Sequence, residues 1–107
     1  MSRFRVYVTP AAWKEIKTLP GKVRQRVRKA VTALAENQRP AKSKALDVPE
    51  LQSEVRRLRL DRWRIVYAIT EADEAVDVLA VRKRPPYDYG DLEALLEDYP
   101  AKEDEGA

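Results

Sequence analysis

The sequence predicts an α+β domain in which a small antiparallel sheet carries two helices on one face. Three observations predict it: an alternating β-rich segment opens the chain, two helical periodicities follow, and three further strand-like segments are separated by short turns. The expected order is β-α-α-β-β-β-α, with the helical hairpin packed on the sheet. We expect one domain over residues 1–99 and an acidic, disordered tail over residues 100–107.

The junction between the first strand and the first helix is marked by two residues. Residues 4–8 alternate and are rich in β-forming side chains. Thr9 is a good N-cap residue and Pro10 fits the first position of a helix, so a short helix should follow over residues 11–18. Its core-facing side chains are expected to be Ala12, Trp13, Ile16 and Leu19.

The second helix, expected over residues 22–37, has the strongest periodic pattern. It follows a break at Pro20-Gly21, so the two helices should form a hairpin. The opposite face of this helix is basic. That face is either a solvated flank or a contribution to the long-range attraction of an anionic partner, and the pattern leaves both open. The core-facing side chains are expected to be Val23, Val27, Ala30, Val31 and Leu34.

The C-terminal half predicts a three-stranded meander. Residues 38–50 contain two prolines and several small or polar residues, which indicates a loop from which Leu46 reaches the core. A short helix should follow over residues 91–97, and the pattern leaves the neighbour of the first strand open. The three strands are expected over residues 51–60, 63–70 and 75–81, joined by turns at residues 61–62 and 71–74.

The composition narrows the possible chemistry. The chain contains no cysteine and no histidine, which removes thiolate metal sites, the commonest general base and the commonest metal ligand. We therefore expect no metal and no cofactor. Without a membrane-length apolar run or a signal-peptide pattern, we expect a cytoplasmic protein with no membrane partner.

The net charge of +3 conceals an uneven distribution of charged residues. Residues 1–70 contain 17 Lys and Arg against 6 Asp and Glu, whereas residues 71–107 contain 4 against 12. A basic body with an acidic end suggests a surface that binds a polyanion. A solvated charged surface would give the same numbers, so charge alone does not decide.

Five arginines lie between residues 56 and 64, within two predicted strands. Alternation places Arg57 and Arg59 on the face opposite Leu58, which should point toward the helices. Unpaired charges are costly to bury, so this open face is expected to bind an anionic ligand, most simply RNA phosphate. The alternative is a set of surface arginines paired with carboxylates, and Arg56 and Arg62 suit that role better. The expected patch comprises Arg57, Arg59, Arg64 and Arg84, with further RNA contacts from Lys42, Lys44, Arg82 and Lys83.

Two tyrosines follow the last strand, at Tyr87 and Tyr89. In a chain without histidine, a tyrosine beside several arginines is a candidate proton acceptor through a lowered pKa, or a stacking platform for a base. The alternative is that either ring packs the final helix onto the sheet. Tyr67, in the middle of a strand, is expected in the core.

These residues resemble the RelE/ParE superfamily of toxins from bacterial type II toxin–antitoxin systems, over about residues 3–95. The most specific part is the hairpin from Arg57-Leu58-Arg59-Leu60 to Trp63-Arg64-Ile65-Val66-Tyr67. The other parts are the first helix with Ala12-Trp13-Lys14-Glu15-Ile16 running to Leu19-Pro20, the basic second helix, and Val81-Arg82-Lys83-Arg84 before a tyrosine.

The resemblance implies a ribosome-dependent mRNA endoribonuclease that inhibits translation by activating the ribose 2′-OH against the adjacent phosphate. It also implies three kinds of partner: an antitoxin of the RelB, ParD or another class, the ribosome with its mRNA, and promoter DNA bound through the antitoxin complex. Two alternatives stay open, a ParE-like toxin that inhibits DNA gyrase and an inactive RNA-binding domain. Members often carry lysines, or a histidine and a glutamate, in the strand that here has arginines. The resemblance assigns catalytic positions to Arg57, Arg59, Arg64 and Arg84, and to Tyr87 or Tyr89.

Overall fold

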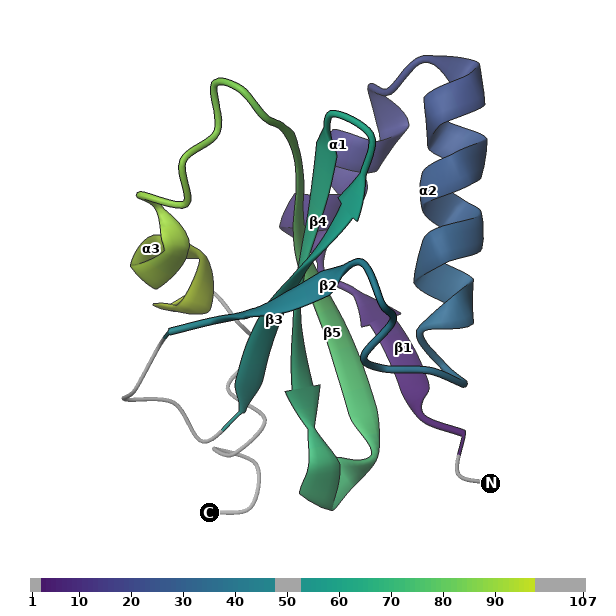
Figure 1. The fold of residues 1–107 in the computed structure, drawn as a ribbon, viewed down its shortest axis with the longest axis vertical. Coiled ribbons are helices and arrows are strands. Elements are labelled where there is room, and N and C mark those ends of the chain that lie inside the picture. Colours follow the sequence, from purple (N-terminus) through teal and green to yellow (C-terminus); the bar gives the residue numbers. More distant parts are fainter. Residues whose placement is uncertain (1–2, 48–52, 98–107) are drawn as a thin grey trace.

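The protein forms a five-stranded sheet with two helices on one face and a short helix on the other (Figure 1). The structure is a computed structural model that describes residues 3–47 and 53–97, so the expected tail lies outside the described residues. Along the chain the elements are β1 (Arg5–Val8), α1 (Pro10–Lys17), α2 (Gly21–Ala33), β2 (Ser43–Leu46), β3 (Glu54–Leu60), β4 (Trp63–Thr70), a 3-10 turn (Glu71–Asp73), β5 (Ala75–Lys83) and α3 (Leu92–Glu97).

The strand order in the sheet is β1-β5-β4-β3-β2. The predicted meander is confirmed: β3, β4 and β5 pair antiparallel with their neighbours in sequence. The first strand, whose neighbour the sequence left open, pairs parallel with β5 at one edge. At the other edge lies a strand that was not predicted, because β2 falls inside the expected loop. Four residues of mixed polarity carry little local signal, and β2 is a strand because β3 offers it a hydrogen-bonding edge.

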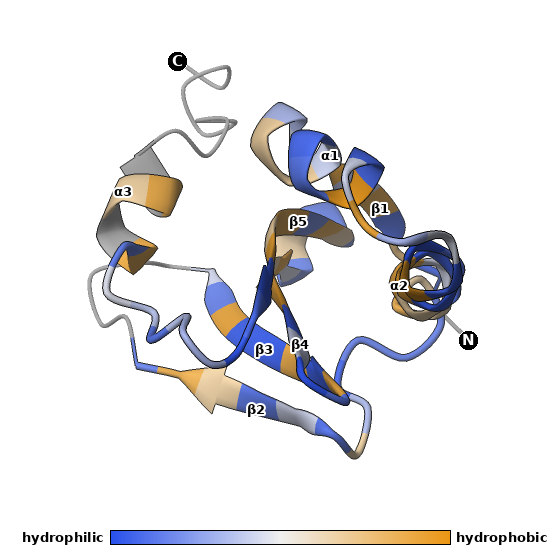
Figure 2. Cartoon of the chain, turned by 90° about the horizontal axis from the view of Figure 1, so that it is seen from above, coloured by the Kyte–Doolittle hydropathy of each residue, from blue (hydrophilic) through white to orange (hydrophobic). Residues whose placement is uncertain are grey.

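Two apolar cores lie on opposite faces of the sheet (Figure 2). The larger core lies between the sheet and the pair α1 and α2, and its largest fully buried side chains include Tyr67, Leu34 and Ile65. The expectation that Tyr67 lies in the core is confirmed. The smaller core lies under α3, where Leu92 and Leu95 cover Val66 and its neighbours. The face opposite the helical hairpin is therefore open only where α3 does not cover it.

Trp13 is not a core residue, contrary to the prediction, because 47% of its surface is exposed. The buried residues of α1 and its end are Ala12, Ile16 and Leu19, which are separated by four and three residues. Trp13 lies one residue, or about 100°, away from that stripe around the helix. Its side chain therefore points to solvent.

The second helix ends at Ala33, four residues earlier than predicted. The side-chain amide of Gln38 donates to the carbonyls of Leu34 and Ala35 at 2.9 and 3.0 Å, which satisfies acceptors at the helix end. The carbonyl of Ala35 also accepts from the amide of Phe4 at 2.8 Å, beside the start of β1. These contacts turn the chain out of the helix and tie that turn to the sheet.

None of the helices in the described ranges, residues 3–47 and 53–97, has the length and apolar character that a membrane crossing requires.

Candidate anion-binding site

A surface hollow of about 270 Å³ lies where β2 meets β3, and four cationic side chains line it together with Ala41 and Ser43. We call these four residues the hollow cations: Lys42, Lys44, Arg57 and Arg59. All four were predicted from the sequence as RNA-contacting residues. The structure brings the two lysines beside the two arginines, which the sequence did not predict because β2 was read as a loop.

The register of the two strands explains this grouping. Lys44 pairs directly with Arg57, and the amide of Arg59 donates to the carbonyl of Lys42 at 3.2 Å. Directly paired residues point to the same face of a sheet. Leu58, between the two arginines, is buried in the larger core, so the arginines must point to the opposite face. The burial of Leu58 thus determines the face to which the side chains of Arg57 and Arg59 point.

The hollow cations form no ion pair with a carboxylate within the part of the chain that the structure describes, whereas five other arginines do. Like charges on facing strand positions cost roughly 0.2–1 kcal/mol per pair. The fold therefore holds an uncompensated positive site that an anion would neutralise. The arginines that do form ion pairs with carboxylates are Arg3, Arg26, Arg39, Arg56 and Arg82.

Arg56 is not the surface residue that the sequence suggested, since only 15% of its side chain is exposed. It pairs with Tyr67 across the β3–β4 ladder and so lies on the face of the helical hairpin. Its guanidinium donates to Ser43 Oγ at 3.0 Å and to Glu54 at 2.6 Å. Arg62, by contrast, is exposed in the turn as predicted. Neither residue contributes to the hollow.

Arg64 lies next to the hollow and is half-buried. It is the direct cross-strand partner of Arg59 on one side and of Arg82 on the other, so the three arginines form a row on one face. Its Nη1 donates to the carbonyls of Asp61 at 2.9 Å and Trp63 at 3.0 Å, while its Nε is buried with no hydrogen-bond partner in residues 3–47 and 53–97. The β3–β4 turn thus holds this guanidinium beside the hollow.

At the far end of the row is a second group, which we call the arginine–tyrosine cluster: Arg82, Arg84, Tyr87 and Tyr89. The guanidinium of Arg82 lies over the ring of Tyr87 at 5.1 Å, and that of Arg84 lies over the ring of Tyr89 at 5.4 Å. The two rings meet edge to face, with 4.8 Å between their centroids. Both rings also pack against the smaller core, as one of the sequence alternatives held.

The pKa of Tyr87 is raised, opposite to the direction that would suit a base. Burial is the main cause, and the nearby carboxylate of Asp91 adds to it, whereas the charge of Arg82 acts in the other direction. The hydroxyl is therefore neutral at neutral pH. The hypothesis that Tyr87 has a lowered pKa is wrong, because burial of the ring and the carboxylate of Asp91 outweigh the charge of Arg82.

Two basic residues of the last strand are separated from the hollow in different ways. Arg82 is bound by two carboxylates, Glu15 from α1 and Asp91 before α3, and so carries no surplus charge. Lys83 pairs with Trp63, which packs against the larger core, so Lys83 lies on the opposite face of the sheet. Their expected contact with the same RNA as the hollow has no support in this arrangement.

The raised pKa of Tyr87 predicts a loss of stability in alkali. A group whose folded pKa is raised stabilises the fold fully below its ordinary pKa of 10.0, and this contribution is lost as pH rises through the folded value. Between about pH 9 and 11, the free energy of unfolding should fall more steeply for the wild type than for Tyr87→Phe. Tyr67, whose pKa burial also raises, contributes to both proteins equally. Urea titrations across this range test the difference, with Tyr7→Phe as a control that should follow the wild type.

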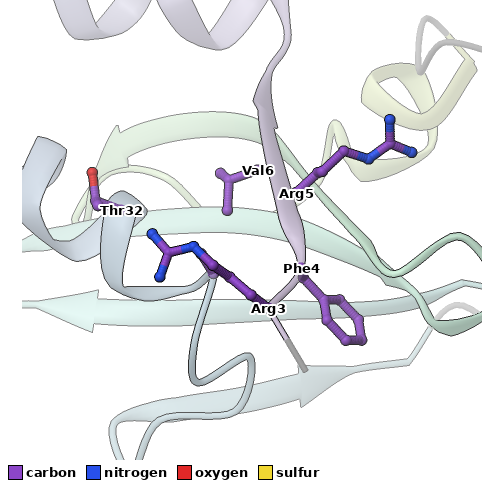
Figure 3. A pocket seen from close by; sticks show the side chains of 6 residues that line it. Arg3, Phe4, Arg5, Val6 and Thr32 are labelled. Carbon is purple, nitrogen blue, oxygen red and sulfur yellow. The ribbon is translucent and has the colours of Figure 1, made fainter. Parts of the chain in front are cut away.

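A second hollow, of about 350 Å³, lies between β1 and the end of α2 and is lined by Phe4, Val6 and Thr32 among others. Figure 3 shows the guanidinium groups of Arg3 and Arg5 pointing to opposite sides of β1. Arg3 is paired with Glu36. This hollow therefore does not concentrate positive charge, and the β2–β3 hollow remains the stronger candidate for an anion.

Comparisons with solved structures place this fold among RelE toxins. The archaeal RelE–RelB complex from Pyrococcus horikoshii matches with a TM-score of 0.71 at 19% identity, over 79% of this chain and 99% of that one. A double variant of Escherichia coli RelE in the free state matches with a TM-score of 0.65 at 22% identity, over 92% and 99%. The intact E. coli RelBE complex matches with a TM-score of 0.60 at 25% identity, over 75% and 95%.

The sequence itself identifies the family. The family model of the ParE toxin of type II toxin–antitoxin systems, parDE, matches residues 6–85. The chain therefore belongs to the ParE toxin family, within the RelE/ParE superfamily of type II toxins. A search of curated proteins found no match.

Proposed function

We propose that this toxin is a ribosome-dependent mRNA endoribonuclease that inhibits translation, and that the β2–β3 hollow binds the mRNA backbone. The observation that carries the proposal is the set of four hollow cations, which have no ion-pair partner among the described residues and lie next to Arg64 on one face of the sheet. The RelE fold of the matching structures supports it.

The residue types in the hollow suit phosphate. Arginine presents a planar fork that binds two phosphate oxygens at once and keeps its charge at every physiological pH. Lysine adds mobile ammonium donors beside the forks. Because two arginines and two lysines share about 270 Å³, one phosphodiester in the hollow would meet several donors together.

The cleavage that we propose is an in-line transesterification. The ribose 2′-oxygen bonds to the adjacent phosphorus while the bond from phosphorus to the 5′-oxygen breaks, which leaves a 2′,3′-cyclic phosphate and a 5′-hydroxyl. The 2′-OH gives up one proton and the leaving 5′-oxygen takes one, so no other reactant is consumed. Negative charge develops on the phosphoryl oxygens during the step, and we assign its stabilisation to Arg57, Arg59 and Arg64, which lie on one face of the sheet.

The proton acceptor is the part that this site does not supply. Among the residues that the structure describes, no carboxylate lines the hollow. Tyr87 has a raised pKa, so its phenol can donate a hydrogen bond but is a poor base at neutral pH. We assign the 2′-OH proton to a water molecule or to a group of the ribosome. A toxin that contributes charge and positioning without a base would need the ribosome for activity.

The proposal includes an antitoxin partner. The matching structures include complexes of RelE with the antitoxin RelB, which supports a related partner for this chain. An acidic antitoxin segment over the hollow would neutralise the same charges that RNA would, and the pair would bind its own promoter DNA through the antitoxin.

Inhibition of DNA gyrase is the second candidate, and two observations favour it. The matching family model is that of ParE, and the hollow lacks a proton acceptor. In this case the cationic face would contact a protein target and no RNA would be cut.

Two assays on the same preparations separate the candidates. Expression of the wild-type toxin should stop incorporation of labelled amino acids, while supercoiling by purified gyrase continues in the presence of the toxin. Arg64→Ala, and the double substitution of Arg57 and Arg59 by alanine, should each restore translation. Toxicity that survives both substitutions, together with blocked supercoiling, would overturn the nuclease proposal in favour of gyrase.

A further inference from the structure

Asp91, just before α3, forms an ion pair with Arg82 of the arginine–tyrosine cluster. Its Oδ2 accepts a hydrogen bond from Arg82 Nη1 at 2.7 Å. From the other side, Glu15 of α1 binds Arg82 Nε, and its second oxygen accepts from the amide of Val81 at 2.8 Å. Arg82 is thus held by one carboxylate from α1, 67 residues earlier in the sequence, and by one from the turn before α3, nine residues later.

The position of Arg82 determines the surroundings of the tyrosines. Its guanidinium lies over the Tyr87 ring, this ring packs edge to face on Tyr89, and Tyr89 in turn lies under Arg84. Arg82 is also the direct cross-strand partner of Arg64. The Asp91–Arg82 ion pair therefore begins a continuous series of contacts that reaches the residues next to the hollow.

The Tyr87 hydroxyl interacts with the carboxylate of Asp91, and this interaction raises the pKa of the phenol. The hydroxyl of Tyr89 and Arg64 Nε are buried and have no hydrogen-bond partner among the described residues. Unsatisfied buried polar atoms each cost about 1–3 kcal/mol, so ring packing and the ion pair must hold this arrangement together.

We propose that Asp91 is a positioning residue: by binding Arg82 against the Tyr87 ring, it fixes the tyrosine pair beside Arg64 and Arg84. Its effect on cleavage rests on the proposed function, whereas its effect on the tyrosines does not. The same ion pair keeps Arg82 neutralised, which leaves phosphate binding to the hollow cations.

The state of Tyr87 gives a readout that does not depend on activity. After burial, the largest causes that raise the pKa of Tyr87 are its hydrogen-bonding interaction with Asp91 and the charge of that carboxylate, whereas the charge of Arg82 lowers it. In Asp91→Asn, the loss of the carboxylate charge should lower the pKa of Tyr87 by about one unit, the scale of a single nearby charge. NMR titration of protein labelled at tyrosine Cζ measures it, and the resonance is assigned with Tyr87→Phe.

The test compares Asp91→Asn with two other variants. Asp91→Glu keeps the charge and should retain a raised Tyr87 pKa. Glu71→Gln is the matched control, because Glu71 makes an equivalent ion pair with Arg39 at 2.7 Å away from the cluster. Thermal unfolding of each variant shows whether a lost activity reflects a lost fold.

The expected result is that Asp91→Asn lowers the Tyr87 pKa and reduces ribosomal mRNA cleavage at least tenfold, while Glu71→Gln changes neither. An unchanged Tyr87 pKa in folded Asp91→Asn would overturn the proposal, and so would wild-type cleavage by that variant. If the wild type cleaves no mRNA but the Tyr87 pKa falls as expected, the proposed function fails and the positioning role of Asp91 stands.

Discussion

Replacing Arg57 and Arg59 together by alanine should lower the affinity for single-stranded RNA by roughly 100-fold. Each arginine–phosphate contact is worth about 1.5–3 kcal/mol as a hydrogen bond to a charged group, and about 1.4 kcal/mol is a factor of ten. The free energy of unfolding should change by less than about 0.5 kcal/mol, because neither side chain has a counterion to lose in the described structure. Fluorescence anisotropy with a labelled oligonucleotide and urea titration measure the two quantities.

The matched control for this pair is Arg24→Ala with Arg28→Ala on the exposed face of α2. This control also removes two positive charges but leaves the hollow intact. It should therefore lower the RNA affinity only a few-fold, through long-range electrostatics. The variant without Arg57 and Arg59 should also show a shallower slope of log affinity against log salt concentration. The change in slope should correspond to the loss of about one to two phosphate contacts. Equal losses from both double variants would mean that RNA responds to net charge and not to the hollow.

The second large effect is expected in the core. Leu34→Ala should lower the free energy of unfolding by about 2–5 kcal/mol, because Leu34 is fully buried where α2 meets the sheet and no neighbour can fill the space. For a domain of this size, that corresponds to a fall in Tm of roughly 10 °C or more. Urea and thermal denaturation measure both, with exposed Thr32→Ala two residues earlier as the control. A loss under 1 kcal/mol, about the cost of a surface change, would mean that the core does not close around Leu34 as described.

The periodic parts of the fold could be predicted because their signals are local. The long β4 and β5 strands and the stripe of Val27, Val31 and Leu34 on α2 are visible in a few residues of sequence. The parallel pairing of β1 with β5 was not predictable, since Arg5 pairs with Ala75, far along the chain. Strand β2 was not predictable because its four residues of mixed polarity form a strand only through their pairing with β3. Trp13 was assigned to the core from its apolar character, although its angular position on α1 excluded it.

The candidate site was predictable to a similar extent. Alternation alone placed Arg57 and Arg59 on the face away from Leu58. The sequence could not show that Arg82 is neutralised, because its partner Glu15 lies 67 residues earlier and in another element. The direction of the Tyr87 pKa likewise depended on burial under α3, which no local pattern of tyrosine and arginine reveals.

Cleavage of a defined mRNA on purified ribosomes is the test of the proposed ribosome-dependent endoribonuclease activity. Primer extension or end-labelled RNA would locate the cut, and the chemistry requires a 2′,3′-cyclic phosphate on the upstream fragment. The wild-type toxin should cut mRNA bound to the ribosome and leave the same mRNA intact without ribosomes, and Arg57→Ala with Arg59→Ala should abolish the cut. Intact mRNA on ribosomes with folded wild-type toxin would contradict the proposed endoribonuclease activity. Cleavage that survives the loss of both arginines would contradict the proposed role of the hollow.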